Sequence, residues 1–368
     1  MPNRIRVAIL FGGRSSEHTI SCATAGGVLG AIDRDKYDVL PIGITRDGAL
    51  TLQPDDAEMF RLNPEAMPEV HDNGTRVLFP ESASTREFHA WELDEQGERV
   101  LRSLGEVDVV FPILHGPFGE DGTVQGMIEL VGLPYVGNGV LGSALGMNKH
   151  YTKSVLEAAG IPVAPWVTIS PTDWSRSNEL WRRRAQGLGL PVFVKPARAG
   201  SSVGVSKVKS WDQLDAALAT AWAEDSTALV EGAIEGREVE CGVLSGRDGG
   251  PPRVSVAGEI VMTTREFYDF DAKYLDDDAA QLICPAELHP GELAAMQRIA
   301  AQAFEAIGGA GLARVDCFFT GTEFIVNELN TMPGFTPISM FPKCWEASGM
   351  SYPDLIDELI QLGLETVR

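Results

Sequence analysis

The stretch 312–330, LARVDCFFTGTEFIVNELN, places charged and amide side chains within two runs that otherwise have the pattern of buried strands. Alternate residues of a strand share a face, so Arg314 and Asp316 point together, as do Glu328 and Asn330. If Asp316 lies opposite Glu328 in an antiparallel hairpin, then Arg314 lies opposite Asn330. One face of the hairpin then presents two carboxylates, one amide and one guanidinium.

Oxygen ligands of this kind favour a divalent cation. Mg²⁺ is usually bound by one or two carboxylates together with substrate phosphates, and two carboxylates this close repel each other unless a cation lies between them. The pattern therefore predicts metal ligands at Asp316, Glu328 and Asn330. The register requires an odd-numbered loop at the hairpin tip, such as residues 321–323. The alternative is a surface hairpin with ordinary salt bridges.

A second stretch, VFVKPARAGSSVGVSKV (192–208), is typical of a phosphate-binding loop. A strand delivers Lys195 to a loop of small residues, whose backbone N–H groups can approach phosphate oxygens closely. The chain contains no Walker A sequence GxxxxGK[ST]. The alternative here is a flexible hairpin tip without a ligand.

Two further loops could contact a substrate. GGRSSEHTIS (12–21) and HGPFGEDGT (115–123) each lead from the carboxyl end of a strand into a helix, where open α/β sheets bind ligands. Glu17, Glu120 and Asp121 are the acidic residues of these loops. Each of them could instead be an ordinary helix cap, because carboxylates are favoured at helix N-termini.

The segment EFYDFDAKYLDDD (266–278) is aromatic and charged, without helical or alternating periodicity. Long segments of this kind in compact domains often form lids that exclude water from a site. Lys273 and Tyr274 lie at its centre. We therefore predict a lid with these two residues facing the substrate.

Three glycines, Gly137, Gly139 and Gly142, match the dinucleotide fingerprint GxGxxG. The strand before them, LPYV, is short, and no strand that ends in an acidic residue follows about 20 residues later. We interpret these glycines as a tight strand-to-helix turn. A nicotinamide-dependent dehydrogenase is the weakest of the alternatives.

The helices and strands that must position these residues predict an α/β protein with three lobes around a shared cleft. RIRVAILFGG, HTISCATAGGVLGAI and YDVLPIGIT have the strand–helix–strand order of a doubly wound sheet. We predict an N-terminal Rossmann-like domain over 1–145, a central lobe over 146–234, and a C-terminal lobe over 235–368 with the hairpin and the lid. Residues 52–106 are polar and weakly periodic, which predicts an insertion or a loosely packed surface.

The composition is that of a globular protein and excludes several partners. The formal net charge of −22 argues against nucleic acid or an acidic membrane surface, although local basic residues and a cation can still bind a nucleotide. The five cysteines (22, 241, 284, 317 and 344) form no CxxC pair and fit a reducing cytoplasm. The absence of a signal-like run and of an 18-residue apolar stretch leads us to expect a cytoplasmic protein.

Seven motifs, in this order and spacing, closely resemble those of the D-alanine–D-alanine ligase family of bacterial cell-wall synthesis: GGRSSEHTIS, HGPFGEDG, MNK, VKPARAGSSVGVS, EFYDFDAKY, ARVDCFF and NELNTMPGFTPIS. The resemblance spans nearly the whole chain apart from residues 46–106 and the extreme C-terminus. It implies a three-lobed ATP-grasp architecture whose N-terminal Rossmann-like domain is the pre-ATP-grasp domain. It also implies ligation of two D-alanine molecules to D-alanyl-D-alanine through a D-alanyl phosphate, with ADP and phosphate as products, for peptidoglycan precursor synthesis.

For ATP, the resemblance implies two lysines that bind phosphates, a segment that holds adenine, a carboxylate that binds the ribose, and a lysine near the transferred phosphate. These residues are, in that order, Lys149 and Lys195; Glu231, Ala233 and Ile234; Glu238; and Lys273. The resemblance also implies that Asp316, Glu328 and Asn330 bind Mg²⁺. Two ions are expected, and Mn²⁺ is expected to substitute for them.

The remaining residues implied by the resemblance bind D-alanine or stabilise charge during catalysis. They are Glu17 for the ammonium of the first substrate, Ser201 and Tyr274 hydrogen-bonded to Glu17, His115 in the first-substrate loop, Arg314 and the Gly334 N–H as an oxyanion hole, and Ser339 near the second carboxylate or the transferred phosphate. The family also suggests a homodimer.

Two other functions stay open at this point. One is an ATP-grasp carboxylate–amine ligase with a different acceptor, although the pair Lys273 and Tyr274 resembles the D-alanine type rather than ligases that accept D-lactate or D-serine. The other is a nucleotide-binding sensor without turnover. The acidic residues, the lysines and the arginine all occur together, which favours an enzyme.

Overall fold

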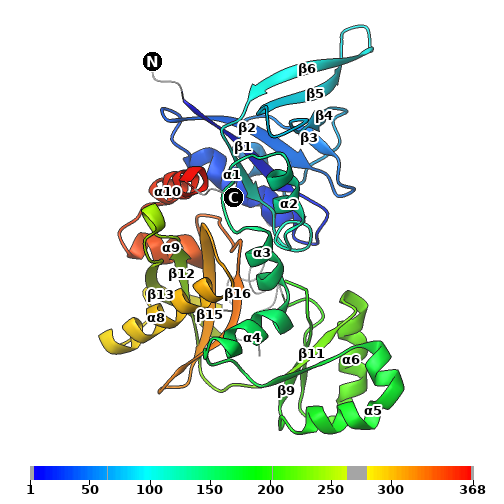
Figure 1. The fold of residues 1–368 in the computed structure, drawn as a ribbon, viewed down its shortest axis with the longest axis vertical. Coiled ribbons are helices and arrows are strands. Elements are labelled where there is room, and N and C mark those ends of the chain that lie inside the picture. The colour runs from blue at the N-terminus through cyan, green and yellow to red at the C-terminus, as the bar shows by residue number, and fades with distance from the viewer. Residues whose placement is uncertain (1–3, 64, 201, 263–279, 366–368) are drawn as a thin grey trace.

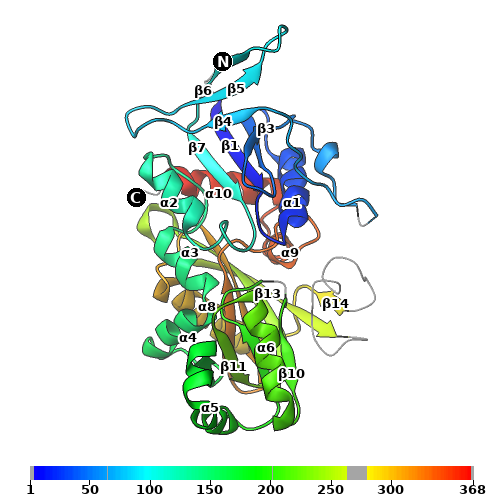
Figure 2. The ribbon, with the colours of Figure 1, turned by 90° about the vertical axis from the view of Figure 1, so that its right-hand side faces the viewer.

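The computed structural model describes residues 4–63, 65–200, 202–262 and 280–365. Three α/β lobes follow one another along the long axis of the molecule (Figures 1 and 2). The N-terminal lobe lies at one end, the sheet formed by the last third of the chain lies in the middle, and the lobe formed by the central residues lies at the other end. No helix within these residues is long and apolar enough to cross a membrane.

The N-terminal lobe is a mostly parallel sheet in the order β3-β2-β1-β7, with β2 and β7 parallel to the central strand β1. Helices α1 and α10 pack on one face, and α2 packs on the other. The elements are β1 (Ile5–Gly12), α1 (His18–Ala31), β2 (Tyr37–Ile44), β3 (Leu50–Leu52), η1 (Glu58–Phe60), β7 (Val109–Ile113), α2 (Thr123–Leu130) and α10 (Tyr352–Glu365).

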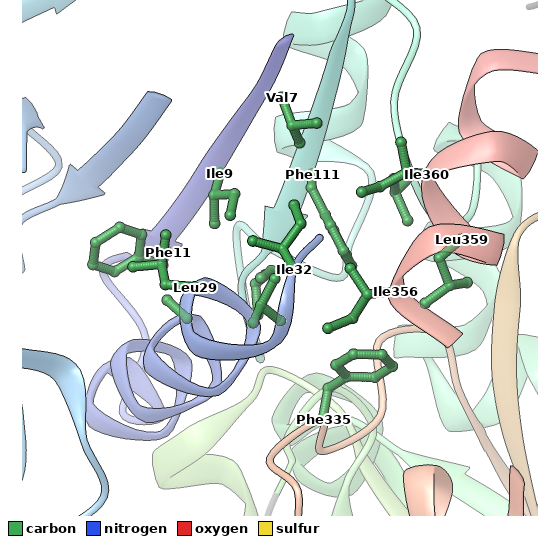
Figure 3. Packing of buried hydrophobic residues seen from close by; sticks show 14 of the residues in the cluster. Val7, Ile9, Phe11, Leu29, Ile32, Phe111, Phe335, Ile356, Leu359 and Ile360 are labelled. Carbon is green, nitrogen blue, oxygen red and sulfur yellow. The ribbon is translucent and has the colours of Figure 1, made fainter. Parts of the chain in front are cut away.

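Alternate residues of β1 belong to two different cores, as expected for a strand buried on both faces. Ile9 and Phe11 pack toward α1 and α10, whereas Ala8 and Leu10 pack toward α2. Figure 3 shows side chains of α10 directed at the sheet beside those of β1, α1 and β7. The last helix of the chain thus completes the core of the first lobe, next to α1 in space.

Residues 52–106 contain an ordered antiparallel sheet in the order β4-β5-β6. These strands are β4 (Arg76–Leu78), β5 (Glu87–Leu93) and β6 (Arg99–Glu106). Phe88 and Ala90 of β5 are fully buried in the core that also contains Leu10. The interpretation as a loosely packed surface is therefore wrong for these strands, whereas the alternative of an insertion stays a prediction. The pattern was hard to detect because only one face of each short strand is buried.

The central lobe is an antiparallel sheet in the order β10-β9-β11-β8, reached from the first lobe through α3 and α4. Its elements are α3 (Val140–Met147), α4 (Lys149–Ala158), β8 (Trp166–Ile169), α5 (Pro171–Gln186), β9 (Val192–Pro196), β10 (Ser206–Val208), η2 (Trp211–Gln213), α6 (Leu214–Glu224) and β11 (Ala228–Gly232). The sequence did not predict α5, which begins at a capping box formed by Ser170 and Asp173. Ala185 is its one fully buried residue, and Trp174 and Trp181 pack, partly buried, against the core of this lobe.

The third lobe is a five-stranded sheet in the order β14-β13-β12-β15-β16. Helix α8 packs on one face, and α9 packs on β12 and β13. The elements are β12 (Arg237–Leu244), η3 (Arg247–Gly249), β13 (Arg253–Met262), β14 (Ala280–Ile283), α8 (Pro290–Ala306), β15 (Leu312–Phe319), β16 (Phe324–Asn330) and α9 (Met340–Ala347). The predicted division of the chain into 1–145, 146–234 and 235–368 stays a prediction.

Candidate active site

A cavity of about 1190 Å³ lies where the three lobes meet. All the predicted site residues that the structure describes line it: Glu17, His115, Lys149, Lys195, Glu231, Ala233, Ile234, Glu238, Arg314, Asp316, Glu328, Asn330, Gly334 and Ser339. Ser201, Lys273 and Tyr274, together with the predicted lid, lie outside the described residues, so their roles stay predictions.

The hairpin of β15 and β16 has the predicted residue pairs, but its loop length differs from the prediction. Asp316 lies opposite Glu328, and Arg314 lies opposite Asn330. The prediction of an odd-numbered loop is wrong, because Phe319 pairs with Phe324 across a four-residue tip. A β-bulge after Asp316 leaves Asn327 without an opposite residue and shifts the register by one. Without that bulge, Asp316 would face Asn327 instead of Glu328.

Arg314, on the same face, contacts two carboxylates. Its Nε and Nη2 each lie 2.7 Å from an oxygen of Asp316, and its Nε lies 3.1 Å from Glu240 Oε2. Burial alone would lower the pKa of Arg314, but Asp316 and Glu240 raise the pKa further above its ordinary value. The guanidinium is therefore a fixed positive charge in the cavity wall.

Glu240 was missed by the sequence analysis. It is 4% exposed, lies opposite Asp316 in the pairing of β12 with β15, and shares a face of β12 with Glu238. The signal for it was the acid at every second position of the strand REVEC. Its importance depends on a contact with Arg314 that only the sheet creates.

The acidic face fits a magnesium ion in the type of its donors. Asn330 Nδ2 donates to Asp316 Oδ2 at 2.9 Å, and Lys149 Nζ lies 3.5 Å from Glu328 Oε2. Among the described residues, three or more His, Cys, Asp or Glu side chains do not come together in a metal-binding cluster, so this face has two carboxylates and an amide rather than three acids. Two carboxylates and one amide suit Mg²⁺, which completes its shell with phosphate oxygens and water.

A buried triad of charges lies in the central lobe, and two of its members, Glu231 and Lys195, line the cavity. Glu231 of β11 contacts Lys153 of α4 through one oxygen and lies 2.5 Å from Lys195 Nζ through the other. The side chains are 5%, 1% and 11% exposed, respectively. Burial alone would raise the pKa of Glu231, but Lys195 and Lys153 lower it. Burial lowers the pKa of Lys153.

Lys153 was also missed by the sequence analysis. It follows Lys149 by one turn of α4, so both side chains project from one side of that helix. Lys149 Nζ donates to the carbonyl of Ala199 in the glycine-rich loop at 2.8 Å. That spacing was visible in MNKHYTK, but nothing in the sequence showed that Glu231 would lie beside the second lysine.

Glu17 occupies the N-cap position of α1, yet its side chain makes no capping hydrogen bond there. Its carboxylate packs against Gly116 and Gly200, where a Cβ atom would lie 2.7 and 2.8 Å from Glu17 Oε2. A side chain at either glycine would push the carboxylate away. The capping interpretation therefore does not account for Glu17, which packs against both the loop 115–123 and the glycine-rich loop.

The two acidic residues of the loop HGPFGEDG have different surroundings. Asp121 precedes the N-cap residue Gly122 of α2, and it accepts hydrogen bonds from the N–H groups of Phe118 and of Thr123, the first residue of that helix. Glu120 accepts a hydrogen bond from the Gly116 N–H at 2.7 Å, and burial together with the charge of Glu17 raises its pKa to about 8.

His115 lies beside these acids, with Nδ1 3.0 Å from the carbonyl of Met332. Burial lowers the pKa of His115, so its imidazole is neutral at pH 7. A neutral imidazole with Nδ1–H donating to that carbonyl leaves Nε2 as an acceptor, 3.3 Å from the hydroxyl of Thr24. The loop NELNTMPGFTPIS thereby contacts the loop 115–123 from the opposite lobe.

Ser339 begins α9 at the rim of the cavity. Its hydroxyl lies 2.8 Å from that of Thr336 and accepts a hydrogen bond from the Thr336 N–H. Gly334, in the same loop, also lines the cavity. The GxGxxG glycines lie elsewhere: Gly137 has φ of +103°, and Asn138 between them donates to backbone carbonyls of the third lobe. A tight turn accounts for them.

The doubly wound first lobe, the two antiparallel sheets and the cavity between them define an ATP-grasp fold, and the charged groups of the cavity are those of an ATP-dependent ligase. Residues 6–138 match the family described as D-ala D-ala ligase N-terminus, and residues 155–361 match D-ala D-ala ligase C-terminus. The chain belongs to the D-alanine–D-alanine ligase family.

Relatives of known identity cover almost the whole chain. The D-alanine–D-alanine ligase of Arthrobacter sp. (strain FB24) is 53% identical, over 98% of this chain and 94% of the relative. That of Streptomyces coelicolor is 50% identical, over 98% and 93%. Among solved structures, the D-alanine–D-alanine ligase of Coxiella burnetii is 34% identical, with a TM-score of 0.80 over 98% of this chain and 94% of that one. The VanG D-Ala:D-Ser ligase of Enterococcus faecalis is 33% identical, with a TM-score of 0.82 over 98% and 100%.

Proposed function

We propose that this protein joins two molecules of D-alanine to D-alanyl-D-alanine, with ATP converted to ADP and phosphate, for peptidoglycan precursor synthesis. The observation that carries the proposal is the cavity of about 1190 Å³ to which all three lobes contribute. It brings the amine-binding candidate Glu17, Lys195 with its partner Glu231, and the acidic face of Asp316 into one space. Those are the groups needed to bind an amino acid, a triphosphate and a divalent cation.

The first half of the reaction activates a carboxylate. A carboxylate is a poor electrophile at neutral pH, so the γ-phosphate of ATP is transferred to the carboxylate of the first D-alanine to give an acyl phosphate. Glu17 orients that substrate through its ammonium. Lys149 and Lys195 neutralise phosphate charge in the transition state.

Asp316, Glu328 and Asn330 would bind Mg²⁺, two ions with Mn²⁺ as a substitute, and the bound metal supplies further neutralisation of the phosphate oxygens. The donors are all oxygen atoms, which is the ligand type that Mg²⁺ and Mn²⁺ accept. The carboxylates of Asp316 and Glu328 are paired with Arg314 and Lys149, and both cations can shift their contacts when a metal binds.

The second half forms the peptide bond. The amine of the second D-alanine attacks the acyl carbon, and the developing oxyanion is stabilised by Arg314 and the Gly334 N–H. Phosphate then leaves. Because an acyl phosphate hydrolyses when water enters, the predicted lid around Tyr274 excludes water during this step. Ser339 binds the second carboxylate or the transferred phosphate.

The test is release of phosphate from ATP as a function of added D-alanine, with Mg²⁺ and with excess chelator. We expect release that depends on both, and a dipeptide product. Glu328→Gln should lower the rate by at least about 100-fold, because it removes a charged ligand from the transition state. Glu323→Gln, at the exposed tip of the same hairpin, is the matched control and should keep the parental rate.

Other outcomes would assign another function. ATP binding without turnover under all conditions would identify a sensor. Preferential use of D-serine as the acceptor, as the name of the VanG enzyme states for that relative, or of D-lactate at neutral pH, would replace the proposed acceptor. We further propose a cytoplasmic homodimer, which light scattering of the purified protein would test.

A further inference from the structure

Two cysteines that are 60 residues apart in the sequence meet at the edge of the third lobe. Cys284 follows the last residue of β14 and is half-buried, whereas Cys344 lies in α9 and is fully buried. Their Sγ atoms are 3.8 Å apart. The proposed ligase reaction uses neither thiol.

The exposed side of this pair opens to solvent through its own small hollow. A surface pocket of about 360 Å³ is lined by Leu282, Cys284, Lys343, Glu346 and Ala347. A small oxidant can therefore reach Cys284 without entering the main cavity. Cys344 lies behind Cys284 and near the carbonyl of Glu240.

The more exposed thiol is the more acidic of the two, as a redox-active pair requires. The hydrogen bond with Cys344, and then the charge of Lys343, lower the pKa of Cys284. The same hydrogen bond and burial raise the pKa of Cys344. Since a thiolate is the nucleophile, Cys284 is the sulfur that attacks and Cys344 is the one that resolves.

We propose that Cys284 and Cys344 form a reversible disulfide when the protein meets a hydroperoxide, and that this disulfide slows the ligase. In the first step, the thiolate of Cys284 attacks the peroxide O–O bond, which gives a sulfenic acid and releases an alcohol or water after protonation. In the second step, the Sγ of Cys344 attacks that sulfenic sulfur, and the hydroxyl leaves as water with the Cys344 proton. Two thiols are oxidised by two electrons, and one peroxide is reduced.

The disulfide would alter the active site because both of its partners adjoin the main cavity. Gln281 and Leu282 of β14 line one wall, and Met340 and Lys343 of α9 line another. Closing the sulfurs from 3.8 Å to a bond of about 2.05 Å draws these walls together. Displacements of about 1 Å can cost on the order of 100-fold in rate. We therefore expect the ligase rate of the oxidised protein to be about 10-fold to 100-fold lower than that of the reduced protein.

The experiment treats the full-length protein with hydrogen peroxide and follows activity, intact mass and disulfide-linked peptides. We expect the loss of two hydrogen atoms per chain, a peptide that links Cys284 to Cys344, and recovery of activity with dithiothreitol. Cys284→Ser should remain active and unmodified. Cys344→Ala should trap the sulfenic acid on Cys284, which a dimedone probe would label. Cys22→Ala changes a buried cysteine of the first lobe and should behave like the parent.

The covalent readout separates this proposal from the proposed function, on which only its activity readout rests. If peroxide produces no link between these two residues, or if the link forms without any change in rate, the proposal is overturned. If D-alanine ligation is absent in the untreated protein while the link still forms, the proposed function fails and the modification site stands.

Discussion

Replacing Lys153 by methionine tests the electrostatic account of the phosphate site. In the buried triad, two lysines and one carboxylate leave one net positive charge. Lys153→Met keeps most of the side-chain volume but leaves Glu231 and Lys195 as a neutral pair. Glu231→Gln leaves two positive charges instead. The double variant returns to one positive charge, now on Lys195 alone.

The size of the effect follows from the burial of the triad. A unit charge about 4 Å from a phosphate oxygen contributes about 4 kcal/mol at an effective dielectric constant of about 20. The cavity is open to water, so we expect about 1.4 to 3 kcal/mol, which is a loss of roughly 10-fold to 150-fold in ATP affinity for Lys153→Met. The double variant should recover most of that loss, because its charge at the site equals that of the parent.

The assay is calorimetric binding of ATP to the four proteins, with urea unfolding of each to show that it is folded. Lys209→Met, at an exposed position of the same lobe, controls for the loss of a lysine in general. The reasoning is refuted if Lys153→Met binds ATP like the parent, or if the double variant binds as weakly as Lys153→Met. Either result would mean that the charge count at Glu231 does not set the affinity.

Two further predictions concern carboxylates. Glu240→Gln should lower kcat about 10-fold to 100-fold and change KM for ATP little, because Glu240 contacts the Arg314 guanidinium, for which we propose a role in the transition state. An unchanged kcat in steady-state kinetics would contradict this. The pKa of Glu120 is raised to about 8 in the folded protein, against about 4.3 when unfolded. Its contribution to stability is therefore complete below about pH 4.3 and is lost as the pH rises through about 8, by at most about 1.4 kcal/mol per pH unit. The free energy of unfolding, measured in urea, should fall between pH 6 and pH 8 in the parent and not in Glu120→Gln. An equal fall in both proteins would contradict the prediction.

Local patterns carried much of the prediction of fold and site. The apolar run of β1 and the segments 18–32 and 37–45 predicted the doubly wound start of the first lobe, and the structure has these elements within a residue or two. Alternation along β15 and β16 placed Asp316, Glu328 and Asn330 on one face. Periodicity and turn residues are properties of neighbouring positions, so the sequence states them directly.

Other features required contacts between distant segments. Glu240 matters because β12 pairs with β15, and Lys153 matters because α4 lies against β11. The bulge at Asn327 compensates for a four-residue hairpin tip, a combination that loop length alone does not reveal. The helix α5 was missed because polar and charged residues dominate its sequence, while few apolar residues, among them Trp174, Trp181 and Ala185, pack against the core.

The sequence by itself determined the kind of chemistry, through the order and spacing of its acidic, basic and glycine-rich motifs. Only the tertiary structure decided which charges neutralise one another, that α10 closes the first lobe, and that Cys284 meets Cys344. The physical reason is range. Backbone geometry couples residues a few positions apart, whereas burial, ion pairing and thiol contact depend on how the lobes pack together.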